Sequence, residues 1–171
     1  MADRVKTLKE WTGKSNTTII YDSTVDEFTA DGLFEKVGGK RNIAMVGFTT
    51  DGDVFGAFYN VAVTEQDEFF YDRNIFAFSF ESHGRCMVPQ RFMVKEGLKH
   101  KALVGFSDDS FGFVQFDVDD VGVAFSLGNE KSNSYCCNMS AGFEGIQNTT
   151  LTGNTYRPYY HCTRLFAIQL S

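Results

Sequence analysis

Two apolar runs joined by a polar bend make up the stretch Asn42-Ile43-Ala44-Met45-Val46-Gly47-Phe48-Thr49-Thr50-Asp51-Gly52-Asp53-Val54-Phe55-Gly56-Ala57-Phe58-Tyr59. Asp51 and Gly52 are residue types that hairpin turns favour, because glycine adopts a positive φ without penalty and aspartate tolerates it. We therefore expect two antiparallel strands, with Asp51 and Gly52 as the two central residues of the turn between them.

Neither run of this hairpin alternates between apolar and polar residues. Residues 44–48 and 54–58 are almost continuously apolar, which is typical of strands that are buried on both faces. Gly47 and Gly56 interrupt the bulky side chains, so we expect a helix or a second sheet to approach closely there. The hairpin is thus expected in the middle of the protein, with Phe55 in the core.

The composition favours one aromatic-rich β domain. A chain of 171 residues suits a single domain, here residues 1–171, and buries about two thirds of the surface of its unfolded form. Its 18 Phe and 7 Tyr favour strands. The net charge of −6 argues against nonspecific binding to nucleic acid or to an anionic membrane, because both need clustered cations.

Helices are expected only in the first quarter of the chain. A short amphipathic helix over residues 3–12 has Asp3 as its cap, Gly13 as its stop and Trp11 to anchor it to the core. A strand follows over residues 17–21. The apolar stripe of a second helix, which Gly38-Gly39 ends, consists of Phe28, Leu33, Phe34 and Val37.

The remainder of the chain reads as short strands separated by turns. After a solvated loop at residues 65–68, Phe76, Phe78 and Phe80 alternate with smaller or polar residues, which predicts a strand with one buried face. Further strands are expected at residues 91–95, 102–106, 111–116, 121–125 and 163–170. The predicted fold class is α+β, mostly β: a two-sheet antiparallel β-sandwich flanked by short helices near the N-terminus.

The amino terminus carries no targeting signal. Residues 1–6 have no apolar run behind their charges, so we expect neither a secretory signal nor membrane insertion, and a cytoplasmic or nuclear location. In such a reducing compartment the four cysteines are expected to be free thiols. The sequence does not fix the oligomeric state.

The order of these elements and their sequence motifs resemble those of the TLDc family, which includes the eukaryotic oxidation resistance proteins. The resemblance runs along the whole chain. It consists of Trp11, Ile19-Ile20-Tyr21-Asp22-Ser23, Leu33-Phe34-Glu35-Lys36-Val37, Thr50-Asp51-Gly52-Asp53-Val54-Phe55-Gly56-Ala57-Phe58, Ile75-Phe76-Ala77-Phe78-Ser79-Phe80 and Leu151-Thr152-Gly153.

This resemblance implies a two-sheet sandwich flanked by helices, without recognised catalytic machinery. It also implies a role in oxidative-stress protection and binding to the vacuolar proton-pumping ATPase. The chain departs from the family in its closing strand, where relatives commonly carry an acidic residue and a tryptophan; residues 165–171 contain neither. A function that depends on that acidic group is not expected here.

No motif in the sequence makes a convincing metal or nucleotide site, and no cofactor is expected. Gly13-Lys14-Ser15 lacks the earlier glycine of a phosphate-binding loop. Asp117 and Asp119 begin like a calcium loop, but Gly128 stands where a bidentate carboxylate is required. Asp51 with Asp53 offers too few oxygen ligands for a cation. His83 with Cys86, and His161 with Cys162, lack the paired spacing of a zinc site.

Three alternatives to a protein-binding domain remain open. Cys136 and Cys137 are candidate redox thiols for a peroxide scavenger or sensor, if the fold supplies groups that lower their pKa. Tyr156, Tyr159 and Tyr160 are candidate stacking residues of a lectin-like sandwich. A nuclear stress regulator would use a local basic patch of Arg85, Arg91, Lys95, Lys99, His100 and Lys101.

The preferred hypothesis is a non-enzymatic intracellular interaction domain. It would act in oxidative-stress protection by binding a protein partner, such as a subunit of the vacuolar ATPase, and nucleic acid is not the expected ligand. No catalytic residue is assigned. The residues singled out as the structural motif are Trp11, Asp51, Gly52, Phe55, Gly56 and Gly153.

Overall fold

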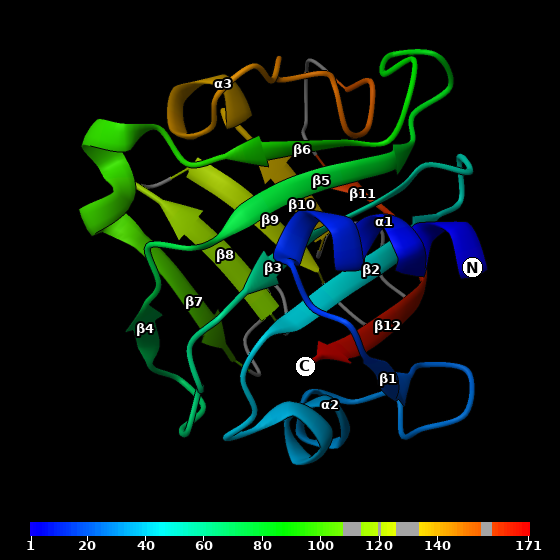
Figure 1. Cartoon of the computed structure of the whole chain (residues 1–171), viewed down its shortest axis with the longest axis vertical. Helices are drawn as coiled ribbons and strands as arrows, with labels where there is room; N and C mark the ends of the chain where they lie inside the picture. Colours follow the sequence, from blue (N-terminus) through cyan, green and yellow to red (C-terminus); the bar gives the residue numbers. More distant parts are fainter. Residues whose placement is uncertain (108–113, 120, 126–133, 155–158) are drawn as a thin grey trace.

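The chain folds into two facing antiparallel sheets with helices at their margins (Figure 1). The computed structural model describes residues 1–107, 114–119, 121–125, 134–154 and 159–171. Within them the helices are α1 (Ala2–Thr12), α2 (Ala30–Val37), the 3-10 helix η1 (Glu96–Lys101) and α3 (Met139–Gly142).

Each sheet contains six strands among the described residues, and every neighbouring pair is antiparallel. The first sheet has the spatial order β1 (Thr17–Asp22), β12 (Cys162–Leu170), β2 (Ile43–Thr49), β3 (Val54–Tyr59), β5 (Phe76–Glu81) and β6 (Gln90–Met93). The second has the order β11 (Tyr159–Tyr160), β10 (Ser134–Cys137), β9 (Val121–Phe125), β8 (Val114–Val118), β7 (Ala102–Phe106) and β4 (Phe69–Tyr71). The fold class predicted from the sequence is confirmed.

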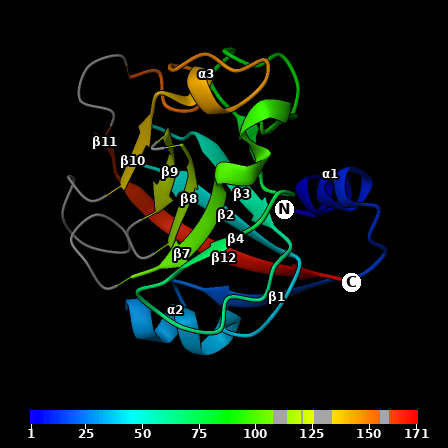
Figure 2. The same cartoon turned by 90° about the vertical axis from the view of Figure 1, so that its left-hand side faces the viewer.

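The β2–β3 hairpin occupies the centre of the first sheet and is covered on both faces, as predicted. All six residues of β3 are buried. On the inner face, Phe55 packs against Phe125 of the second sheet with ring centroids 5.8 Å apart. On the outer face, α1 crosses the sheet on the side opposite the second sheet (Figure 2).

The turn of this hairpin differs from the prediction. The Gly52 N–H donates to the Thr49 carbonyl at 3.0 Å, so the central residues of the turn are Thr50 and Asp51. Gly52 follows them with φ +84°, and it is the one of the predicted pair that takes a positive φ. Such a three-residue loop, a turn followed by a left-handed glycine, is a common alternative to the two-residue hairpin.

Different neighbours exclude a side chain at the two strand glycines, Gly47 and Gly56. A Cβ at Gly47 would lie 2.4 Å from the Phe125 ring, so the second sheet requires this glycine as predicted. A Cβ at Gly56 would lie 1.8 Å from the Met45 carbonyl oxygen and 2.7 Å from the Phe78 ring. Both of these neighbours belong to the first sheet, so the expectation of another layer at Gly56 was wrong.

Strand β5 is buried on both faces, which corrects the prediction of one buried face. Phe76, Phe78 and Phe80 point to the outer face, where the ring of Trp11 stacks on Phe80 at 5.7 Å. Ala77 and Ser79 on the other face are also fully buried. Small residues alternate with phenylalanine here because a second layer covers them, not because they face water.

The helix boundaries correct three further details. Asp3 lies inside the first turn of α1, whose N-cap is Met1, whereas Gly13 ends the helix in the left-handed conformation as predicted. Thr29 caps α2 through its side chain, so Phe28, which the prediction placed in the apolar stripe, lies before the helix and is exposed. The helices are not confined to the first quarter, because η1 and α3 come later.

Several short strands were missed. The sequence did not predict β4, β10 or β11, which contain two to four residues each and are too short to show a period. Predicted strands 91–95, 111–116 and 163–170 correspond to β6, β8 and β12 with shifted ends. Residues 111–113 lie outside the described part of the chain.

Candidate functional site

A buried carboxylate lies where the central hairpin begins its second strand. Asp53 precedes β3 directly and is only 2% exposed. Its N–H donates to the Thr49 side-chain oxygen at 3.1 Å, and its carbonyl accepts from the Thr49 N–H at 3.0 Å. The tight turn therefore fixes the Asp53 backbone and directs its carboxylate inward, toward the β5–β6 segment.

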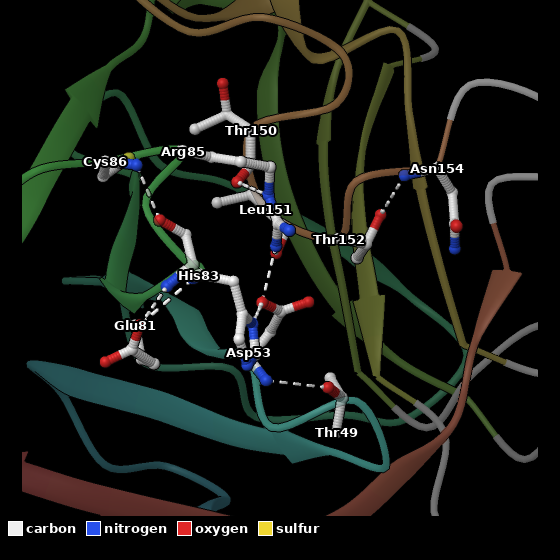
Figure 3. A network of polar contacts seen from close by, with 11 residues as sticks. Thr49, Asp53, Glu81, His83, Arg85, Cys86, Thr150, Leu151, Thr152 and Asn154 are labelled. Carbon is white, nitrogen blue, oxygen red and sulfur yellow. Dashed lines mark hydrogen bonds and ion pairs between the residues drawn. The ribbon is translucent and has the colours of Figure 1, made fainter.

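An imidazole and a guanidinium group meet on one oxygen of this carboxylate (Figure 3). His83 Nδ1 lies 2.9 Å from Asp53 Oδ1, and an Arg85 guanidinium nitrogen donates to the same oxygen at 2.5 Å. A charge this deeply buried is stable only when it is paired and hydrogen-bonded. We call the group of Asp53, His83 and Arg85 the Asp53 clamp.

Arg85 also bonds a third segment of the chain. Its guanidinium donates to the Thr150 carbonyl at 3.0 Å and to the Leu151 carbonyl at 3.0 Å. Leu151 is itself buried in the inter-sheet core. The clamp therefore joins the hairpin turn, the β5–β6 segment and the segment before β11, which are far apart in the sequence.

Local turns at the start of the β5–β6 segment place His83 and Arg85. The Glu81 carboxylate accepts hydrogen bonds from the N–H groups of Ser82 and His83, both at 3.1 Å. The Ser82 hydroxyl accepts from the Cys86 N–H at 2.7 Å. His83 has φ +49° and Gly84 has φ +83°, so the chain reverses sharply here.

Two glycines leave room for the clamp. A Cβ at Gly52 would lie 3.3 Å from the His83 ring, and one at Gly153 would lie 3.1 Å from the Arg85 guanidinium. Both glycines also have a positive φ, +84° and +75°, which disfavours any side chain. The imidazole and the guanidinium thus pack directly on backbone at these two points.

An exposed apolar tip follows the clamp directly in the sequence. Met87 and Val88 follow Arg85 closely and are 91% and 67% exposed. Two adjacent exposed apolar side chains make this segment a candidate contact surface for another molecule. The clamp is better suited to positioning its segment than to catalysis. Arg85 already bonds the Asp53 oxygen that His83 contacts, and it bonds two backbone carbonyls as well.

A family model for the TLDc domain matches residues 2–165 of the 171-residue chain. The chain belongs to the TLDc family. This family is generally linked to oxidative-stress resistance. The comparison with curated proteins returned no match.

The TLDc match ends at residue 165, within β12, so the second half of this strand lies outside it. The resemblance inferred from the sequence is confirmed over the rest of the chain. Within the described ranges, none of the helices of this TLDc chain has the length and apolar character needed to cross a membrane.

The structural motif of this TLDc chain is divided between the two faces of the first sheet and the clamp. Trp11 packs on the outer face against Phe76, Phe78 and Phe80. Phe55 and Gly56 lie in β3, while Asp51 is exposed at the hairpin tip. Gly52 lies beside the His83 ring of the clamp and Gly153 beside its Arg85 guanidinium.

The candidate redox thiols are in an unfavourable environment. Cys136 is buried, and burial raises its pKa well above the ordinary value; burial also raises the pKa of the half-buried Cys137. Both shifts lower the fraction of reactive thiolate at neutral pH. Burial likewise raises the pKa of Cys162 to about 12, and all four cysteines are free thiols.

The tyrosines of the lectin hypothesis do not form one exposed platform. Tyr160 is buried, and its hydroxyl donates to the Ala124 carbonyl at 2.7 Å. Tyr159 is 44% exposed, and Tyr156 lies outside the described residues. Stacking of a sugar on Tyr160 is therefore ruled out by its packing.

Three of the six residues of the proposed basic patch are paired with carboxylates. Lys99 pairs with Glu96 at 2.6 Å, Lys101 pairs with Asp119, and Arg85 belongs to the clamp. Paired cations release few counterions on binding a phosphate backbone, so they contribute little to nucleic-acid affinity.

The residues weighed as metal ligands have other roles. His83 and Asp53 contact each other in the clamp, whereas Cys86 contributes its N–H to Ser82. Cys162 Sγ donates to the Arg164 carbonyl at 3.3 Å. Across the described ranges, no three His, Cys, Asp or Glu side chains gather closely enough to hold a metal ion.

Sequence reasoning missed the clamp because it considered its members separately. Asp53 was weighed with Asp51 for a cation, His83 with Cys86 for zinc, and Arg85 with other cations for a basic patch. The available signal was the position of Asp53, a charged residue directly before a fully buried strand. Such a residue needs a partner, and a remote arginine or histidine is the expected one.

Proposed function

We propose that this TLDc chain is a non-enzymatic, intracellular protein-interaction domain that acts in oxidative-stress protection. The observation that carries the proposal is the exposed apolar tip, Met87 and Val88, on a segment that Arg85 fixes to Asp53. Anchoring the backbone beneath these two side chains lowers the entropy that the segment itself loses when a partner covers it.

The partner that we propose is the vacuolar proton-pumping ATPase. Its support is the resemblance to the TLDc family. The raised pKa values of Cys136 and Cys137 give no support to a thiol-based peroxide scavenger, which needs a stabilised thiolate. The proposed activity is therefore binding, not peroxide chemistry.

Capture of the purified, detergent-solubilised ATPase on the immobilised chain tests this function. The native chain is expected to retain pump subunits, and the double variant Met87→Asp, Val88→Asp to retain about tenfold less, because each carboxylate would have to be desolvated at the contact. Val25→Asp is the matched control, since Val25 is 82% exposed on the β1–α2 segment. Figure 1 shows that segment far from the β5–β6 connection.

A third variant separates the tip from its anchor. Asp53→Ala removes the carboxylate that holds Arg85, so the tip is retained but its base is loosened. We expect capture to fall between that of the native chain and that of the double variant, with the far-ultraviolet circular dichroism preserved. Absence of any pump subunit on the native chain, or equal capture by the double variant and Val25→Asp, would contradict the proposal.

A further inference from the structure

A hollow of about 250 Å³ lies at the C-terminal end of α1, on the outer face of the first sheet. Its floor is aromatic and consists of Trp11, Phe58 and Phe76. The rings of Phe58 and Phe76 are stacked with centroids 5.0 Å apart, and Trp11 meets Phe76 edge-on at 6.3 Å. We call this feature the α1 hollow.

The rim of the α1 hollow is polar and carries positive charge. Lys14 and Arg91 line it together with Asn42, Asn60 and Asn74. No Asp or Glu is among the described residues that line it. This charge is opposite in sign to the chain as a whole, whose net charge is −6.

Contacts with the surrounding structure hold the rim in place. Arg91 donates to the Trp11 carbonyl, and its guanidinium lies 5.8 Å from the Phe76 ring centre. The Asn60 amide donates to the Asn42 side-chain oxygen. The residues after Lys14 are anchored because the N–H groups of Ser15 and Asn16 both donate to the carbonyl of Ser171, at 3.1 and 2.8 Å.

The size and chemistry of the α1 hollow suit a segment of a peptide. Small-molecule sites commonly enclose about 300–1,000 Å³, so this smaller volume is better matched to one inserted side chain. An aromatic floor favours an aromatic or large aliphatic group. Asparagine side chains can exchange hydrogen bonds with a peptide backbone, and the two cations select for neighbouring carboxylates.

We propose that the α1 hollow binds an acidic peptide segment of a partner protein, in which carboxylates flank one apolar side chain. Charge complementarity carries this choice of occupant, because an acidic protein presents a cationic rim around an apolar floor. The proposal rests on the proposed function as a protein-interaction domain. It adds a second contact, since the hollow lies near Phe76 and Met93 whereas the Met87–Val88 tip connects the other ends of β5 and β6.

Fluorescence of Trp11 provides a direct measurement, because it is the only tryptophan in the chain and lies in the floor of the hollow. The probe is the acetylated and amidated peptide Gly-Asp-Phe-Asp-Gly, and its control is Gly-Asn-Phe-Asn-Gly. We expect a saturable change in emission with the acidic peptide that weakens as salt rises. The amide control should bind about tenfold more weakly. No saturable change, or equal binding of both peptides, would overturn the proposal.

A charge reversal at the rim tests the location. Lys14→Glu is expected to weaken binding of the acidic peptide about tenfold, because it places a carboxylate against the carboxylates of the peptide. Lys6→Glu is the control, since Lys6 is an exposed residue of α1 that does not line the hollow. Equal losses in the two variants would refute the assignment.

The outcomes distinguish this proposal from the proposed function. The Met87→Asp, Val88→Asp double variant should bind the peptide like the native chain. Peptide binding that survives in a chain unable to capture the ATPase would contradict the proposed partner and support the hollow. Capture of the ATPase without peptide binding would overturn the hollow alone.

Discussion

The two faces of the first sheet are covered in different ways. On the inner face a second sheet packs against Phe55, which contacts Phe125 and Tyr160 with ring centroids 5.8 and 5.0 Å away. On the outer face a single helix, α1, supplies Leu8 and Trp11. A sheet can cover another sheet over its whole width, whereas one helix covers only a strip.

Arginine side chains complete the cover of the outer face. Guanidinium groups lie over aromatic rings at 5.3 Å for Arg4 on Phe48, 5.8 Å for Arg91 on Phe76 and 4.3 Å for Arg164 on Phe166. Such pairs shield an aromatic ring while the charge stays in water. The comparison teaches that the inner face supplies stability, while the incompletely covered outer face is available for recognition.

The largest expected effect comes from opening the inner face. Phe55→Ala should lower the free energy of unfolding by about 3–5 kcal/mol, because it leaves a cavity between two sheets that cannot both relax. Urea unfolding followed by circular dichroism measures this change. A loss below about 1 kcal/mol would show that the inner face repacks easily and does not supply more stability than the outer face.

A smaller and more local effect is expected on the outer face. Leu8 is the fully buried residue of α1, so Leu8→Ala should weaken the attachment of this helix to the sheet by about 2 kcal/mol. Because α1 is the only helix on that face in the described structure, it should detach before the sheets unfold. Emission of Trp11 would then shift to the red at lower urea than the circular dichroism transition. Coincident transitions would show that α1 and the sandwich unfold as one unit.

The smallest effect concerns an ion pair at the margin of the outer face. Arg164 donates two hydrogen bonds to Asp22, at 3.0 and 2.6 Å, and these bonds lower the pKa of Asp22 from 3.8 to about 2. A carboxyl group whose pKa is depressed by folding stabilises the protein above its unfolded pKa, and this stability is lost as it becomes protonated. The contribution should therefore be complete above about pH 4 and disappear as the pH falls toward 2.

Urea unfolding between pH 5 and 2 measures this contribution. We expect on the order of 1 kcal/mol, because Arg164 is partly exposed and water screens the pair. Asp22→Asn should reduce the loss of stability over this range by about that amount. An unchanged pH profile in the variant would assign the acid sensitivity to other carboxylates.

Local patterns predicted the parts of the fold that are long and apolar. The β2–β3 hairpin and β9 follow from continuous apolar runs bounded by turn residues, and α1, with Trp11 on its apolar side, follows from helical periodicity and a closing glycine. Strand β5 shows the limit of this approach, since alternation of phenylalanine with alanine and serine does not reveal whether the small residues face water or a second sheet.

The candidate site could be predicted only in part. Gly52 and Gly153 carry a local signal, because each needs a positive φ. The partners of Asp53 are 30 and 32 residues away along the chain, and Arg85 reaches carbonyls 65 and 66 residues away. No spacing rule connects these positions, because Asp53 meets His83 and Arg85 only after β3 and β5 have paired, and Arg85 meets the carbonyls of residues 150 and 151 only in the completed fold.

The sequence by itself determined the family, the antiparallel character of the chain and the central place of its hairpin, because these depend on apolar runs and turn residues that act over a few positions. The tertiary structure decided which charges are paired and which remain available. Asp53 lost its freedom to bind a cation when packing brought His83 and Arg85 to it, whereas Lys14 and Arg91 gained a shared aromatic floor. Electrostatic partners are chosen by proximity in space, and only the completed fold defines that proximity.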